Sequence, residues 1–178
     1  TGGSYCDQIL IVQLLNEVLP PEVNIYIKEH KSQFYLDQEG VAGRDEIFYR
    51  RISNISPRIY FDSIDADPFT LIDGAIATIT ISGTIGWESA IRGTATINFG
   101  RAWYEGMPRT HRVHTKKELF CALEKARTEK GIDILDDIYD FHRQLEDTFV
   151  KATHYKSYIG KGDVSESESI EALINVIK

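Results

Sequence analysis

The stretch AIATITISGTIGWESAIRGTATINFG, residues 75–100, places a short helical segment between two segments rich in isoleucine and threonine. Because β-branched residues favour extended backbone, residues 75–81 and 94–99 are expected to be strands. The segment between them predicts a helix that runs to Arg92, with Gly93 as its C-terminal stop. A strand, a helix and a second strand in this order are typical of a parallel α/β sheet.

Two more strands and several helices are expected outside this stretch. The strands are predicted at residues 24–28 and 58–62. Apolar periodicity and capping residues predict helices at residues 7–19, 44–55, 67–74, 116–130, 132–154 and 167–177. Residues 31–43 and 100–115 show neither period and are expected to be irregular.

These elements predict an α/β fold built on a doubly wound parallel sheet, with a helical C-terminal extension. The expected domain spans residues 1–159, and residues 160–178 are expected to form a polar linker and a terminal helix. Such sheets bind ligands beyond the carboxyl ends of their strands.

The composition fits one soluble globular domain, with 178 residues, 42% hydrophobic and 26% charged. The longest apolar run, residues 75–81, is far shorter than the ~20 residues that a membrane span needs. Cys6 and Cys121 are too few for a disulfide framework and are expected to be buried thiols in a reducing cytoplasm.

The charge is uneven along the chain. A formal net charge of −7 argues against a nucleic-acid partner. Residues 92–117, however, carry six Lys and Arg against Glu105 alone, a local charge of +5. This segment is expected to attract anions, and a solvated loop with unpaired arginines is the alternative.

The glycine-containing turn at residues 82–86 is the strongest candidate for a ligand site. Gly83 and Gly86 let the backbone approach a ligand closely, and the hydroxyls of Ser82 and Thr84 add hydrogen bonds for a phosphate at the helix start. Glu88 would repel phosphate but can bind sugar hydroxyls. The pattern therefore predicts phosphate at the turn and ribose at Glu88, and a capped helix without a ligand is the alternative.

Other candidates follow the remaining strands. His30 follows the predicted strand, closing the segment NIYIKE, and can bond a phosphate or assist a departing one, although a surface histidine is the plainer interpretation. Arg101 and Tyr104 follow the strand at residues 94–99 and can hold a diphosphate, base or sugar. We expect His30, Ser82, Thr84 and Glu88 to converge in one cleft. His111 and His114 lack a helical pattern and a carboxylate cluster, so no metal site is expected.

Four segments together carry a resemblance to a known family. They are DQ at 7–8, LP…VNIYIKEH at 19–30, SGTIGWESAIRGTATINFG at 82–100 and WY at 103–104. In these segments the chain resembles capsular polysaccharide biosynthesis proteins, which are bacterial glycosyltransferases of the GT-B fold, akin to the capsule Kdo transferases. Lys31 stands where the family usually has proline after Lys-Glu-His, and Thr94-Ala95 stands where Lys-Pro is common.

The resemblance implies the C-terminal, donor-binding half of such an enzyme. His30 would meet the donor phosphate as the candidate catalytic residue, Ser82 and Thr84 would cradle that phosphate, and Glu88 would bind ribose. The acceptor and the usual catalytic base would come from an N-terminal domain ahead of Thr1, so this chain alone is expected to be catalytically incomplete.

The expected function is donor binding in the synthesis of capsular or other surface polysaccharide in the cytoplasm. No cofactor is expected, because the nucleotide sugar is a substrate, with a CMP-linked sugar as one candidate. A glycan or glycolipid acceptor and peripheral association with the inner membrane face are further expectations. The alternatives are an epimerase acting on a nucleotide sugar and a noncatalytic nucleotide- or sugar-binding module.

Overall fold

The computed structural model describes residues 3–34, 43–130, 132–146, 148–150, 152 and 165–177. The chain divides into two compact units, Thr1–Leu135 and Asp136–Lys178. The domain boundary expected at residues 159 and 160 falls inside the second unit and outside the described residues.

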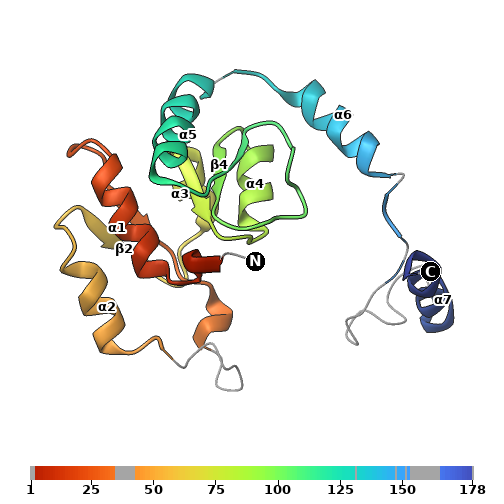
Figure 1. Ribbon diagram of the computed structural model, residues 1–178, viewed down its shortest axis with the longest axis horizontal. Coiled ribbons are helices and arrows are strands. Elements are labelled where there is room, and N and C mark those ends of the chain that lie inside the picture. The colour runs from red at the N-terminus through yellow and green to blue at the C-terminus, as the bar shows by residue number, and fades with distance from the viewer. Residues whose placement is uncertain are drawn as a thin grey trace. The chain divides into compact units, whose positions relative to one another are not determined.

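The first unit mixes helices and strands along the chain, and helices separate its strands except β4 and β5 (Figure 1). Its elements are η1 (Gly3–Cys6), α1 (Gln8–Val18), β1 (Ile25–Ile27), η2 (Lys31–Phe34), α2 (Glu46–Ser53), β2 (Ile59–Phe61), α3 (Pro68–Gly74), β3 (Ala77–Thr80), α4 (Ile85–Ile91), β4 (Ala95–Asn98), β5 (Thr110–Arg112) and α5 (Lys116–Glu129). The helices α6 (Leu135–Glu146) and α7 (Glu166–Ile177) follow. The four strands predicted from sequence are confirmed as β1 to β4.

Side-chain caps explain where several helices begin. Asp7, Asp45, Asp67 and Thr115 each accept a hydrogen bond from a backbone N–H in the first turn of the helix that follows. Ser165 and Glu168 form a reciprocal capping box at the start of α7, where each side chain accepts from the other residue's backbone N–H. At the other end of α4, Gly93 has a φ of 84°, which confirms it as the predicted stop.

The strands form two small parallel sheets. β1 pairs with β2 in one, and β3, β4 and β5 lie in that order in the other. The single doubly wound sheet expected from sequence is therefore not observed among the described residues. The α/β class and the parallel pairing are confirmed, whereas the β1–β2 pair and the three-stranded β3–β4–β5 sheet are separate.

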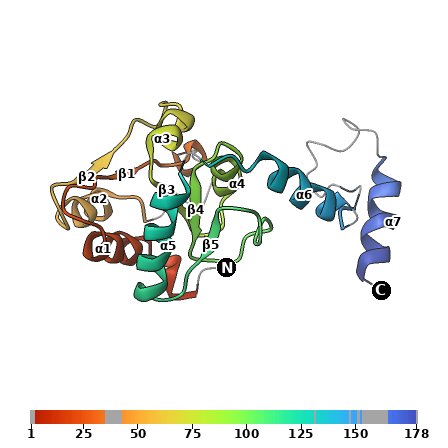
Figure 2. The same cartoon turned by 90° about the horizontal axis from the view of Figure 1, so that it is seen from above.

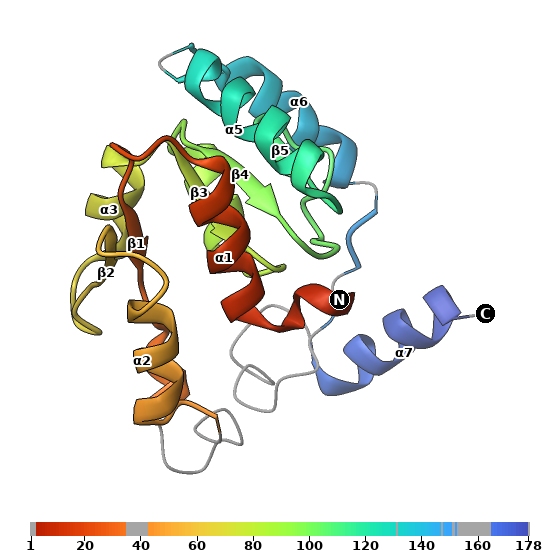
Figure 3. The ribbon, with the colours of Figure 1, turned by 60° about the vertical axis from the view of Figure 1, so that its left-hand side comes forward.

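The β3–β4–β5 sheet is covered on both faces. α1 and α5 lie side by side over one face (Figure 3), where Ile97 packs with Leu119 and Val113 in the core. α4 covers the other face, on the opposite side of β4 from α5 (Figure 2). There Thr96 Oγ1 donates to Gly86 O at 2.7 Å. All four residues of β4 are buried.

Three local expectations are corrected. β5 lies inside residues 100–115, which were expected to be irregular, and pairs with β4 from Thr96 to Asn98. α6 ends at Glu146, and residues 148–150 are not helical, so the helix expected at 132–154 is shorter than predicted. Cys6 and Cys121 are both exposed rather than buried. Cys121 is exposed because it lies off the face of α5 that buries Leu119, Ala122 and Leu123.

No helix in the described parts of the chain combines the length and the apolar character needed to cross a membrane.

Arg58, immediately before β2, ties the end of α1 to the sheet. Its Nε donates to Asn16 Oδ1 at 3.0 Å, and its two terminal nitrogens donate to the backbone carbonyls of Asn16, Leu19, Pro20 and Val23. A planar guanidinium can reach several acceptors at once, whereas an ammonium cannot reproduce that fork. One side chain thus satisfies carbonyls at and beyond the C-terminus of α1, where helical partners are missing.

Arg58→Lys is expected to lower the free energy of unfolding by about 1–3 kcal/mol, because several half-buried carbonyls lose their donor. Urea unfolding followed by tryptophan fluorescence measures this, since Trp87 and Trp103 both lie in the first unit. Arg51→Lys on α2, where the arginine is exposed, is the matched control. Equal unfolding midpoints for the two variants would contradict the role of Arg58.

Candidate functional site

The turn at residues 82–86 lies at the carboxyl end of β3. Just before the turn, two backbone hydrogen bonds extend the pairing between β3 and β4. Phe99 N–H donates to Thr80 O at 3.0 Å, and Gly100 N–H donates to Ile81 O at 2.7 Å. Gly83 N–H then donates to Thr80 Oγ1 at 3.1 Å. These bonds fix the backbone at the point where the strand turns into α4.

Tyr104 supports the turn from below. Its side chain is 0% exposed, and its hydroxyl lies 2.7 Å from Gly83 O and 3.0 Å from Asn98 Oδ1, sharing its proton between these two acceptors. Burial raises the pKa of Tyr104 to about 12, and the hydrogen bond to Asn98 opposes part of that increase. The hydroxyl therefore stays neutral and joins the turn, the end of β4 and the loop that follows β4.

Gly86 is required by this arrangement. A Cβ there would lie 2.1 Å from the Tyr104 hydroxyl and 2.7 Å from Thr96 Cγ2. Gly86 is buried, so its missing side chain makes room for Tyr104 rather than for a ligand. Because Tyr104 is also buried, its ring supports the turn and has no exposed face on which a ligand could stack.

The outer side of the turn carries polar groups that face solvent. Gly83 and Thr84 are exposed, while Ser82 and Glu88 are half-buried. Thr84 occupies the N-cap position of α4 without a capping hydrogen bond from its side chain. Among the described residues, the Glu88 carboxylate has no ion-pair or hydrogen-bond partner in the structure. The turn therefore combines a fixed underside with an outer side whose polar groups remain available.

Arg101 and Trp103 lie on the loop beyond β4. The Arg101 side chain is 78% exposed, with Nε 3.8 Å from Glu105. The indole of Trp103 is 49% exposed, and its centroid lies 5.7 Å from that of Trp87 and 5.5 Å from that of Tyr104. A guanidinium and an aromatic ring are thus presented near the residue that supports the turn.

Most of the basic side chains at residues 92–117 have hydrogen-bond or ion-pair partners within the chain. Arg92 forms two hydrogen bonds to Asp73, of 2.8 and 2.5 Å, Arg112 lies 3.1 Å from Glu105, and Lys116 lies 2.7 Å from Glu17. Arg109 is buried and donates to the backbone carbonyls of Gly93 and Ile132. The local excess of positive charge is therefore largely compensated, and the expected attraction for anions is reduced to its exposed members such as Arg101.

His30 is exposed and follows β1, so it belongs to the other sheet. Its carbonyl accepts from Gln33 N–H at 3.0 Å at the start of η2. Both His30 and the turn follow the carboxyl ends of parallel strands, and their convergence in one cleft stays a prediction.

His111 does not pair with His114. Its Nε2 lies 3.1 Å from Glu129 Oε2, which links β5 to α5. Within the ranges that the structure describes, no three His, Cys, Asp or Glu side chains gather closely enough to hold a metal ion.

Sequence reasoning missed the support provided by Tyr104 and Asn98. The available signal was the amide side chain of Asn98 at the end of a strand of β-branched and apolar residues, since a buried amide requires hydrogen-bond partners. Which partner it finds depends on how the loop after β4 folds back, and the sequence carries no local sign of that.

Comparisons with protein-family models, with curated proteins and with solved structures found no match to this chain.

Tyr104→Phe is expected to lower the free energy of unfolding by about 1–3 kcal/mol at neutral pH, because Gly83 O and Asn98 Oδ1 lose their shared donor. The folded-state pKa is raised, so the stabilisation is complete below about pH 10 and is lost as the pH rises towards about 12. The difference between wild type and variant should shrink by about 1 kcal/mol between about pH 9 and about pH 11.

Urea unfolding at a series of pH values tests both parts of this prediction. Tyr26→Phe is the control, because Tyr26 is an exposed tyrosine of the other sheet. If the deficit of Tyr104→Phe stayed constant up to the highest pH, the buried hydroxyl would not be the group that titrates.

Proposed function

We propose that this chain is the donor-binding half of a GT-B glycosyltransferase that acts in the cytoplasm on a nucleotide sugar, in the synthesis of capsular or other surface polysaccharide. In this proposal the two parallel sheets are parts of one doubly wound half. The acceptor, a glycan or glycolipid, and the catalytic base belong to an N-terminal domain, and the enzyme works at the inner membrane face.

The observation that carries the proposal is the anchored turn at residues 82–86. Tyr104 holds Gly83 O from below, while Gly83 and Thr84 are exposed at the carboxyl end of β3. Parallel α/β sheets bind their ligands at this end of their strands. A turn that is fixed before the ligand arrives loses little conformational freedom on binding, which favours recognition of a compact group such as phosphate.

Each polar group of the turn suits one part of a nucleotide sugar. The hydroxyls of Ser82 and Thr84 suit the phosphate, because they donate hydrogen bonds to anionic oxygens. The Glu88 carboxylate suits ribose, since it accepts from hydroxyls. Arg101 is exposed and suits a second phosphate, and the exposed ring of Trp103 suits stacking on the base.

His30 is assigned to the departing phosphate. A protonated imidazole can donate to the leaving oxygen and lower the cost of the charge that develops there. Because the turn itself contains no acid and base pair, the same observations also support a noncatalytic nucleotide-binding module as a second candidate. Binding measurements on two variants separate the roles of the residues.

Glu88→Gln is expected to weaken the binding of nucleoside mono- and diphosphates by about 1–3 kcal/mol, because the amide accepts weaker hydrogen bonds from ribose than a carboxylate does. Folding should barely change, since the carboxylate has no partner among the described residues. Calorimetry with CMP, UDP, GDP and their sugars measures the affinity, and Glu124→Gln on α5 is the control. A fall in melting temperature with unchanged nucleotide affinity would assign Glu88 to helix capping.

His30→Ala is expected to lower the affinity for nucleoside diphosphates about tenfold and to leave the affinity for free nucleosides unchanged, since the lost contact is to phosphate. The same titrations with cytidine, uridine and guanosine supply the comparison. His114→Ala, at another exposed histidine, is the control. If nucleosides and nucleotides lost affinity equally, His30 would not contact the phosphate.

A further inference from the structure

A concave site lies at the carboxyl ends of β1 and β2, and no residue of the turn at 82–86 lines it. It is an open pocket of about 400 Å³ between these strand ends, η2 and α2. Ligand pockets in proteins commonly have volumes of roughly 300–1,000 Å³. None of the site residues predicted from sequence lines this pocket.

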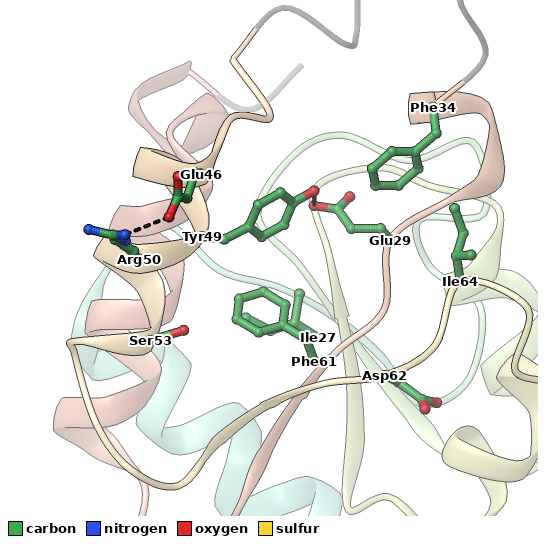
Figure 4. A pocket seen from close by; sticks show the side chains of 10 residues that line it. All are labelled: Ile27, Glu29, Phe34, Glu46, Tyr49, Arg50, Ser53, Phe61, Asp62 and Ile64. Atoms are coloured by element: carbon green, nitrogen blue, oxygen red, sulfur yellow. Dashed lines mark hydrogen bonds and ion pairs between the residues drawn. The ribbon is translucent and has the colours of Figure 1, made fainter.

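Three of the ten residues that line it are aromatic, and they come from η2, α2 and β2. Figure 4 shows Tyr49 and Phe34 on opposite sides of the pocket with the Glu29 carboxylate between them, and Phe61 and Ile27 below Tyr49. Tyr49 and Phe61 meet edge to face at 5.4 Å between centroids. Phe34 is 44% exposed and Phe61 is 38% exposed, so their faces are accessible to a ligand. Rings held in this way offer flat apolar surfaces of fixed orientation.

Two of the three carboxylates at the pocket are paired with arginines, and the third accepts from the backbone. Glu29 Oε1 lies 2.9 Å from Arg44 Nε, an ion pair without the geometry of a hydrogen bond, and the two side chains are only 17% and 14% exposed. Glu46 on the rim accepts from Arg50 at 2.5 Å. Asp62 accepts from the backbone N–H of Ser63. Most of the formal charge is therefore compensated before any ligand binds.

Tyr49 adds a polar group to the wall. Its hydroxyl lies 3.4 Å from Glu29 Oε1. Burial raises the pKa of Tyr49, and the negative charge of Glu29 adds to the increase, so the hydroxyl keeps its proton. The wall thus offers both donors and acceptors, in Tyr49, Glu29 and Arg50, beside the apolar rings.

We propose that this pocket binds an electrically neutral pyranose ring, with an apolar face of the sugar on the ring of Phe34 and its hydroxyls towards Glu29 and Tyr49. A pyranose has C–H faces and a hydroxyl edge that both donates and accepts, which matches the rings and the paired polar groups. A phosphate would meet three carboxylates, Glu29, Glu46 and Asp62, and a cation would compete with Arg44 and Arg50 for partners already satisfied. The inference does not depend on nucleotide binding at the turn.

Saturation-transfer NMR on the full 178-residue chain tests the proposal. The neutral probes are the methyl glycosides of glucose, galactose and N-acetylglucosamine, and the charged probes are N-acetylneuraminic acid, methyl phosphate and tetramethylammonium. At least one neutral glycoside is expected to receive saturation and to bind more tightly than every charged probe. Absence of transfer to all three neutral glycosides, or tighter binding of a charged probe, would overturn the proposal.

Variants then locate the binding. Phe34→Ala and Phe34→Leu are both expected to lower glycoside affinity about five- to tenfold, because each removes the ring, while Leu keeps apolar volume for folding. Phe120→Ala, at an exposed phenylalanine on α5, is the matched control and should leave the affinity unchanged. Equal affinities in the Phe34 and Phe120 variants would also overturn the proposal.

Discussion

The hydroxyl of Tyr104 is the contact on which the arrangement around the turn depends. It lies 2.7 Å from Gly83 O and 3.0 Å from Asn98 Oδ1, in a space that exists only because residue 86 has no side chain. One buried group thereby fixes the turn after β3, the start of α4 and the loop after β4. The exposed polar groups of the turn are held in place by a side chain that is itself 0% exposed, so packing beneath the turn sets their positions.

Local sequence patterns predicted the elements that carry local signals. β3, α4 and β4 follow from runs of isoleucine and threonine and from the stop at Gly93, and Asp67 before Pro68 marks the start of α3. β5 has the sequence Thr-His-Arg, with no alternation of apolar and polar residues, and is a strand only because β4 lies beside it. The division into two sheets could not be predicted either, since pairing between strands far apart in sequence leaves no local pattern.

At the candidate site, the compensation of the charges could not be predicted from sequence either. The excess of positive charge at residues 92–117 is plain in the sequence, but Asp73 and Glu17, which compensate Arg92 and Lys116, are 19 and 99 residues away. Arg109 donates to backbone carbonyls, which have no formal charge and therefore do not enter a count of charged residues. The rings of the pocket, Phe34, Tyr49 and Phe61, likewise come from three separate elements. Exposure and partners, rather than residue type, distinguish a binding group from a structural one.

The partners of Arg58 have a consequence for how this sequence can vary. Four of its five acceptors are backbone carbonyls, at Asn16, Leu19, Pro20 and Val23, and every residue type supplies a carbonyl. Mutations that replace the side chains of Leu19 or Val23 therefore leave these bonds intact, whereas replacement of Arg58 removes all of them. Related sequences should keep an arginine before β2 while the segment it holds diverges. Covariation between positions would reveal only the bond to the Asn16 side chain, because the other four acceptors belong to the backbone.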